Sequence, residues 1–136
     1  MRVVLDTSAM QAFLDEDDPQ HVAAVDAFAS LHDQNADLVT HQYVVVECIS
    51  LVQRRLGMTA LRTLVEAVLP NVEVIWIDAD LHADAVALML SGGTKQVSLV
   101  DWTSFIVMRR LGITTAFAFD ADFAAQGFEV IPAAAA

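Results

Sequence analysis

The chain has 136 residues, a length that suits one domain with a sizeable buried core. Hydrophobic residues make up 56% of it, and this composition excludes an intrinsically disordered chain. The formal net charge of −11 argues against a simple nucleic-acid binder, which would need a basic surface.

Short apolar runs alternate along the chain with segments of helical pattern. In chain order, we expect a strand over residues 2–6, helices over 7–14 and 20–31, a strand over 37–41, helices over 42–56 and 58–69, a strand over 73–77, helices over 78–90 and 99–111, and strands over 115–119 and 128–131. Gly57, Pro70 and Gly112 mark helix ends. The alternation predicts a parallel sheet covered on both faces.

The expected fold is therefore α/β, a three-layer α/β/α sandwich with a short, mainly parallel sheet. Residues 1–132 form a single domain, because the sequence shows no internal repeat and no linker. The terminal alanines, 133–136, have nothing to pack against and are expected to fray. In the helix over 20–31, we expect Val22, Val25, Phe28 and Ala29 to face the core.

The sequence also limits the chemistry and the compartment. Cys48 is the single cysteine, so an internal disulfide and a cysteine-based zinc site are both excluded. No uncharged apolar run approaches the ~18 residues that a membrane-spanning helix needs. Asp6 comes too early to leave room for the apolar region of a signal peptide. We expect a cytoplasmic protein.

Several acidic residues stand at the ends of predicted elements. Asp6 ends the first strand, Asp120 follows the strand over 115–119, and Asp101 lies in the first turn of the helix that Ser98 caps. In open α/β sheets, ligands bind beyond the carboxyl ends of the strands. Each of these residues, and Asp122 as well, could instead be a simple turn or capping residue. Only their convergence would make a site.

Glu47 lies within the strongly apolar helix over 42–56. At ~100° per residue, Tyr43, Glu47, Ser50 and Arg54 fall on one narrow polar stripe, which suits a cleft wall as well as a solvent-facing surface. Arg54 and Arg55 could hold a phosphate backbone near Glu47, or could simply complement the end of their helix. The helix over 58–69 has more apolar surface than one buried face needs, which indicates a protein contact.

Carboxylates that crowd together repel one another unless a cation neutralises them. Sites made of oxygen ligands alone favour hard ions such as Mg²⁺ or Mn²⁺. Such ions polarise phosphoryl oxygens and lower the pKa of bound water, and two of them could clamp the attacking and leaving oxygens of a phosphodiester. Hydrolysis by metal-activated water would need no covalent nucleophile from the protein.

Four segments together resemble the PIN-domain ribonucleases, and in particular the VapC-type toxins of prokaryotic toxin–antitoxin pairs. These segments are LDTSA, the helix that carries Glu47, SLVDWTSFIVMRRLGI and FDADF, and they span essentially the whole chain. The resemblance implies an α/β/α fold and Mg²⁺- or Mn²⁺-dependent RNA cleavage. It also implies a homodimer that a cognate antitoxin inhibits.

The resemblance assigns roles to particular residues. It implies an acidic quartet of Asp6, Glu47, Asp101 and Asp120, with Asp122 as an auxiliary metal ligand and Ser8 as a polar helper beside Asp6. The chain departs from the family pattern at Ala118, where members often carry Thr or Ser two residues before the fourth acid. The hydroxyl's role would then fall to water or to Thr115.

Two other classes of function compete with the nuclease. Asp6 at a strand end could be the nucleophile of a phosphatase or phosphotransferase, although a haloacid-dehalogenase-like enzyme would need a second Asp where Ser8 stands. In a non-catalytic binding module, the acids would be helix caps and the apolar helices would form an assembly surface. A phosphatase assay and a test of metal dependence separate the three classes.

Overall fold

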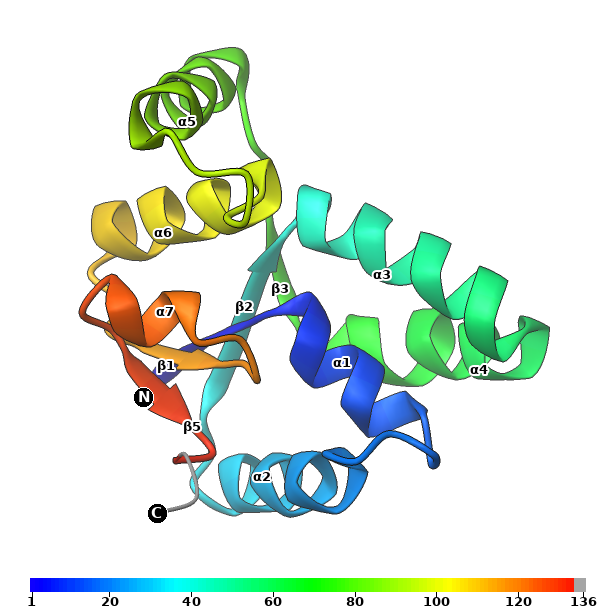
Figure 1. Cartoon of the computed structure of the whole chain (residues 1–136). Helices are drawn as coiled ribbons and strands as arrows, with labels where there is room; N and C mark the ends of the chain where they lie inside the picture. The colour runs from blue at the N-terminus through cyan, green and yellow to red at the C-terminus, as the bar shows by residue number, and fades with distance from the viewer. Residues whose placement is uncertain (134–136) are drawn as a thin grey trace.

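A computed structural model describes residues 1–133 as a three-layer arrangement with a central parallel sheet (Figure 1). The strands are β1 (Arg2–Leu5), β2 (Asp37–His41), β3 (Glu73–Ile75), β4 (Thr115–Phe117) and β5 (Glu129–Ile131). The helical elements are α1 (Thr7–Leu14), α2 (His21–Asp33), α3 (Gln42–Leu56), α4 (Met58–Thr63), η1 (Leu64–Val68), η2 (Leu69–Asn71), α5 (Ala79–Gly92), α6 (Leu99–Leu111) and α7 (Asp122–Ala125). The predicted fold class is confirmed.

The strands lie in the order β3-β2-β1-β4-β5, and every neighbouring pair is parallel. The chain builds the sheet outward from β1 to β3, then returns to place β4 on the other side of β1. Leu5 pairs with Phe117 in this central pair, so β1 and β4 end side by side. A reversal of strand order of this kind opens a crevice at the carboxyl ends of the two strands.

The alternation of side chains along β1 divides the core between the two faces of the sheet. Val3 and Leu5 pack under α1, α2 and α3, whereas Val4 packs under α6 together with Phe105. All three β1 residues are fully buried, as expected for a central strand covered on both faces. Helix α5 packs on α6 rather than on the sheet (Figure 1).

Helix α2 differs from the sequence prediction in the face that it buries. Val22 is 70% exposed and Ala29 is also exposed, while Ala24 and Leu31 are buried. Phe28 packs partly on the core as predicted. The prediction of the inward face was wrong for Val22, Val25 and Ala29 because this alanine-rich helix has apolar residues on several faces, so hydrophobicity alone does not select one.

Two further expectations are refined by the backbone. Asp6 is the N-cap of α1, because its side chain accepts a hydrogen bond from the Ser8 N–H, so it caps a helix as well as following β1. The helix predicted over 58–69 changes hydrogen-bonding pattern along its length, from α4 through the π-helix η1 to the 3₁₀-helix η2 at Pro70. None of the helices within residues 1–133 has the length and apolar character needed to cross a membrane. Of the tail expected to fray, residues 134–136 lie outside the described residues.

His41 connects the end of β2 to α6 within the core. Its side chain is fully buried, and its Nε2 lies 2.8 Å from Ser104 Oγ. Because Ser104 Oγ–H donates to the Val100 carbonyl, the serine oxygen accepts from His41 Nε2–H, which fixes the neutral tautomer. Burial lowers the pKa of His41 to about 4.

We expect His41→Ala to lower the free energy of unfolding by about 3 kcal/mol, because it leaves a cavity and removes the hydrogen bond between His41 and Ser104. Chemical denaturation at pH 7.5 measures this loss. His32→Ala, at an exposed position of α2, is the matched control and should change stability by less than about 0.5 kcal/mol. Equal effects of the two variants would contradict the structural role of His41.

Candidate active site

Three carboxylates from distant parts of the chain meet where β1 and β4 end. Asp6 follows β1, Asp120 follows β4, and Asp101 lies in the first turn of α6. One carboxylate oxygen from each lies within 4.8 Å of the others. The convergence on which the sequence argument depended is therefore present at the crevice between the central strands.

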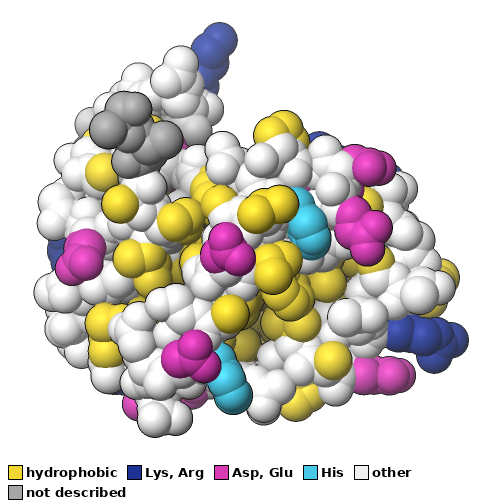
Figure 2. Space-filling view, turned by 90° about the horizontal axis from the view of Figure 1, so that it is seen from below, with side chains coloured by type: hydrophobic (Ala, Val, Ile, Leu, Met, Phe, Trp, Pro, Cys, Tyr) yellow, Lys and Arg dark blue, Asp and Glu magenta, His cyan; other side chains and the backbone are white. Residues whose placement is uncertain are grey.

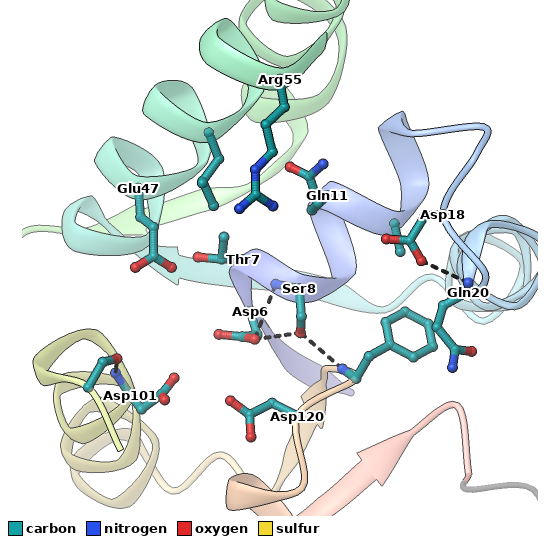
Figure 3. A pocket seen from close by; sticks show the side chains of 14 residues that line it. Asp6, Thr7, Ser8, Gln11, Asp18, Gln20, Glu47, Arg55, Asp101 and Asp120 are labelled. Carbon is teal, nitrogen blue, oxygen red and sulfur yellow. Dashed lines mark hydrogen bonds between the residues drawn. The ribbon is translucent and has the colours of Figure 1, made fainter. Parts of the chain in front are cut away.

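Ser8 links Asp6 to the segment that carries Asp120. Its hydroxyl donates to Asp6 Oδ2 at 2.5 Å and accepts from the Phe119 N–H at 3.0 Å. Asp6 Oδ2 also accepts from the Ser8 N–H at 3.2 Å. The serine therefore fixes the rotamer of Asp6 and ties the end of β4 to α1, as Figure 3 shows by its dashed lines.

Burial and mutual repulsion disfavour the charged form of two of these acids. Desolvation raises the pKa of Asp6 to about 6, against the opposing effect of its hydrogen bonds from Ser8. Desolvation, followed by the charges of Asp6 and Asp120, raises the pKa of Asp101 to about 7. Asp101 is only 8% exposed, a backbone hydrogen bond from Ser98 opposes the rise in its pKa, and no residue among 1–133 forms an ion pair with its carboxylate.

The carboxylates open into a cavity of about 390 Å³. Glu47 and Arg55 project into it from α3, on the side opposite Asp101 and Asp120 (Figure 3). Ser98, the residue that caps α6, completes the wall beside Asp101. The cavity is thus acidic at its floor and carries one arginine at its edge.

The remaining predicted site residues lie at different distances from this centre. Asp122 is not in the group of three acids that lie within ligand distance, and its backbone N–H donates to Asp120 Oδ1 at 2.8 Å. Arg54 is exposed and does not line the cavity, whereas Arg55 does. Of the polar stripe predicted on α3, Glu47 lines the cavity and Ser50 does not. Leu51 lines the cavity in place of Ser50.

The structure excludes one of the two substitutes considered for the hydroxyl missing at Ala118. Thr115 is the first residue of β4 and pairs with Val3, at the opposite end of the strand from Asp120. Ser8 instead supplies the hydroxyl that contacts this segment, through Phe119.

Sequence reasoning missed Gln11, which also lines the cavity. Its Oε1 is buried and has no hydrogen-bond partner among residues 1–133. Because Thr7 and Gln11 lie four residues apart on α1, they form a polar row on a helix whose other residues, apart from Ser8, are apolar. That row was the signal available in the sequence.

The site meets the requirements of a hard divalent cation. Its ligand atoms are carboxylate oxygens, three of them within ligand distance of one another. The raised pKa values of Asp6 and Asp101 indicate negative charge that the protein itself does not compensate. A bound cation would supply that compensation. Asp6, Asp101 and Asp120 are the residues that would hold it.

Comparison with known proteins agrees with this geometry. Residues 3–129 match the PIN domain family. The chain is 36% identical over 132 residues to the 23S rRNA-specific endonuclease VapC20 of Mycobacterium tuberculosis, and the match covers 96% of this chain and 98% of the relative. The same relationship holds for VapC20 from a second strain of that species.

Solved structures extend the comparison to the fold. The crystal structure of M. tuberculosis VapC20, described as a sarcin–ricin loop cleaving toxin, superimposes with a TM-score of 0.83 at 34% identity, covering 93% of this chain and 95% of that one. FitAcB from Neisseria gonorrhoeae has a TM-score of 0.68 at 19% identity, with 96% of each chain covered, and shows the fold alone. Family match, identity and superposition agree: the chain belongs to the PIN-domain family, among its VapC-type toxins.

Proposed function

We propose that this protein is a metal-dependent endoribonuclease, the toxin of a toxin–antitoxin pair, which cleaves RNA phosphodiester bonds with water. The convergence of Asp6, Asp101 and Asp120 at the β1/β4 crevice carries the proposal. The proposed cofactor is Mg²⁺ or Mn²⁺, which when bound polarises phosphoryl oxygens and makes water a stronger acid. The named activity of the VapC20 relative supports RNA as the substrate.

Each residue has a distinct part in this proposal. Asp6, Asp101 and Asp120 hold the cation, and Ser8 keeps Asp6 in its rotamer. Glu47, across the cavity, accepts the proton of the attacking water, whose oxygen bonds to phosphorus as the bond to the leaving ribose oxygen breaks. Arg55 holds a substrate phosphate at the edge, with Arg54 beside it on the helix surface. Asp122 supports Asp120 or adds a ligand when substrate is bound.

The central experiment is cleavage of RNA by the purified chain with Mn²⁺ or Mg²⁺, with EDTA, and with Mn²⁺ restored in excess of EDTA. We expect cleavage only in the presence of the free cation. The substrates are 23S rRNA, a stem-loop with the sarcin–ricin sequence, and transfer RNA as a comparison. The first two test whether this chain shares the target named for VapC20. Cleavage that continues in EDTA would contradict the metal-dependent mechanism, and phosphatase activity without nuclease activity would favour the aspartate nucleophile.

Two surfaces support the proposed protein partners. Trp76 is 76% and Val46 is 60% exposed, and hydrogen bonds between Gln42 and the backbone of Ile77 place their segments together. We assign this face to the homodimer, because exposed apolar patches mark protein contacts. Light scattering of the wild type and Trp76→Ser tests it, with a dimer-to-monomer shift expected.

The antitoxin has a different surface available. A cavity of about 340 Å³ opens between α1, α2 and η1, with Phe13, Phe28 and Val68 in its walls. The face of the molecule seen from below also carries hydrophobic side chains around a hollow (Figure 2). We propose that an apolar antitoxin segment occupies the cavity, as amphipathic helices occupy grooves in other complexes. Ala67→Asp, at an exposed position of η1 that also lines this cavity, should then weaken binding of the antitoxin without weakening RNA cleavage.

A further inference from the structure

One row of side chains on α3 runs through the active site and beyond it. Tyr43, Glu47, Leu51 and Arg55 are spaced four residues apart, so they lie on one face of the helix. The last three line the carboxylate cavity, and Tyr43 lies one turn beyond Glu47. At 1.5 Å per residue the row is ~18 Å long. With Tyr43, this row continues the line of cavity-facing side chains along the surface of α3.

The far end of this row is an aromatic pair. Tyr43 Oη lies 2.6 Å from His82 Nδ1 of α5, and the two ring centroids are 5.8 Å apart. The buried His41 supports the tyrosine from below in an edge-to-face contact, also at 5.8 Å. Tyr43 is half-buried and His82 is exposed. The pair is therefore held in place by the core while part of its aromatic surface faces solvent.

The distribution of cations shows why an aromatic contact matters here. Arg2, Arg62 and Arg110 form ion pairs with acids of the protein, and Arg109 contacts Gln126 and the ring of Phe128. Only Arg54, Arg55 and Lys95 form no ion pair or side-chain hydrogen bond among residues 1–133, and of these Arg55 alone lines the cavity.

With a net charge of −11, this protein gains little RNA affinity from overall electrostatic attraction. Stacking of bases on aromatic rings supplies affinity that does not require positive charge. The Tyr43–His82 pair lies on the side of Glu47 away from Arg55, where charge contributes least.

We propose that the α3 row is a track for a single RNA strand. Arg55 holds a phosphate on one side of the cleaved bond, and the Tyr43–His82 pair stacks an unpaired base on the other. The proposal rests on the endoribonuclease function and adds to it the residues that bind the strand on either side of the cleaved bond. A base in a duplex cannot leave its stack without cost, so the substrate is a single-stranded or loop segment.

Cleavage kinetics on a single-stranded RNA and on the same RNA annealed to its complement test the track, with Mn²⁺ present. Tyr43→Leu fills the space beside His41 but removes the ring, and it should raise KM about 5- to 100-fold with kcat within about threefold of wild type. Tyr43→Phe keeps the ring and should stay within about threefold in KM. Arg55→Gln should raise KM and reduce its dependence on salt. The duplex should be cut far more slowly than the single strand.

Matched controls lie elsewhere on the surface. His82→Ala removes the second ring of the pair and should raise KM as Tyr43→Leu does, with His32→Ala as its control. Arg62→Gln, at an exposed position of α4, is the control for Arg55→Gln. Quenching of 2-aminopurine in a non-cleavable 2′-O-methyl RNA reports stacking directly, and it should fall in Tyr43→Leu and persist in Tyr43→Phe. A manganese-induced rise in Tm checks that each variant keeps its fold and metal site.

The outcomes separate this inference from the function on which it rests. If the wild type cleaves RNA but Tyr43→Leu leaves KM and 2-aminopurine quenching unchanged, the track is wrong and the nuclease stands. Equal cleavage of duplex and single strand would also overturn the track alone. If the wild type cleaves no RNA with any divalent cation, both proposals fail.

Discussion

Replacing Asp101 by asparagine is expected to lower the rate of RNA cleavage by about a thousandfold and, at the same time, to raise the Tm of the metal-free protein. Activity falls because asparagine offers the cation a neutral oxygen in place of a charged one. Stability rises because the Asp101 carboxylate is buried and faces Asp6 and Asp120, and the backbone hydrogen bond from Ser98 does not offset this cost.

The raised pKa gives the size of the stability effect. A shift from 3.8 in the unfolded chain to about 7 in the folded protein corresponds to at most about 4 kcal/mol of destabilisation at pH 8, where the group is ionised in both states. Asparagine has nearly the same shape and no charge, so it removes this penalty. The backbone N–H of residue 101 keeps its hydrogen bond to Ser98 Oγ.

Thermal unfolding in EDTA at pH 8, together with single-turnover cleavage in Mn²⁺, measures both effects on one sample. Asp37→Asn, at an exposed position at the start of β2, is the matched control and should change neither. A variant that loses activity and also loses stability would indicate that Asp101 has a structural role, and it would contradict the metal-ligand assignment. Manganese should raise the Tm of the wild type and much less that of Asp101→Asn.

The acids at the crevice were predictable because of how strands and helices end. Asp6 and Asp120 each follow a short apolar run, and parallel strands place all their carboxyl ends at one edge of the sheet. Asp101 lies in the first turn of the helix that Ser98 caps, and its part in a site depended on convergence with the other two acids. These inferences need only local pattern and the parallel arrangement.

Other features required the packed structure. Helical spacing placed Arg54 and Arg55 together, but only the tilt of α3 against α1 decides that Arg55 lines the cavity. Ser8 was predicted beside Asp6, but its second contact, from the Phe119 N–H after β4, joins residues 111 positions apart in sequence. The Tyr43–His82 contact joins α3 and α5, and the hydrophobic periodicity of two helices does not predict the distance between them. The helices and strands could be predicted from the sequence, but the distances between side chains on different elements could not.

Manganese is expected to stabilise the protein strongly at pH 8 and much less at pH 5.5. In the metal-free protein, Asp6 and Asp101 bind protons near pH 6 and pH 7 when folded, but only near 3.8 when unfolded. The folded state therefore binds more protons between these values, and the metal-free protein becomes more stable as the pH falls from 8 towards 5.5. The cation requires the ionised carboxylates, so protons compete with it over the same range.

His41 acts in the opposite direction within this range of pH. Its pKa is about 4 in the folded protein and 6.5 in the unfolded chain, so stability is lost as the pH falls from 6.5 through 4. Below about pH 6 this loss offsets part of the gain from the two acids. The two acids together outweigh His41 down to pH 5.5, so the metal-free protein should keep gaining stability as the pH falls, by less than the acids alone would give.

Scanning fluorimetry from pH 5.5 to 8, in EDTA and in saturating Mn²⁺, measures the two curves. A cation at 100 times its Kd adds about 2.7 kcal/mol, which is a large shift for a domain of this size. The curves should lie far apart at pH 8 and converge towards pH 5.5. If the metal-free Tm instead rises with pH across this range, Asp6 and Asp101 are not held as uncompensated carboxylates in the folded protein. The electrostatic reason for a cation at the β1/β4 crevice would then be lost, even if the three oxygens lie within ligand distance.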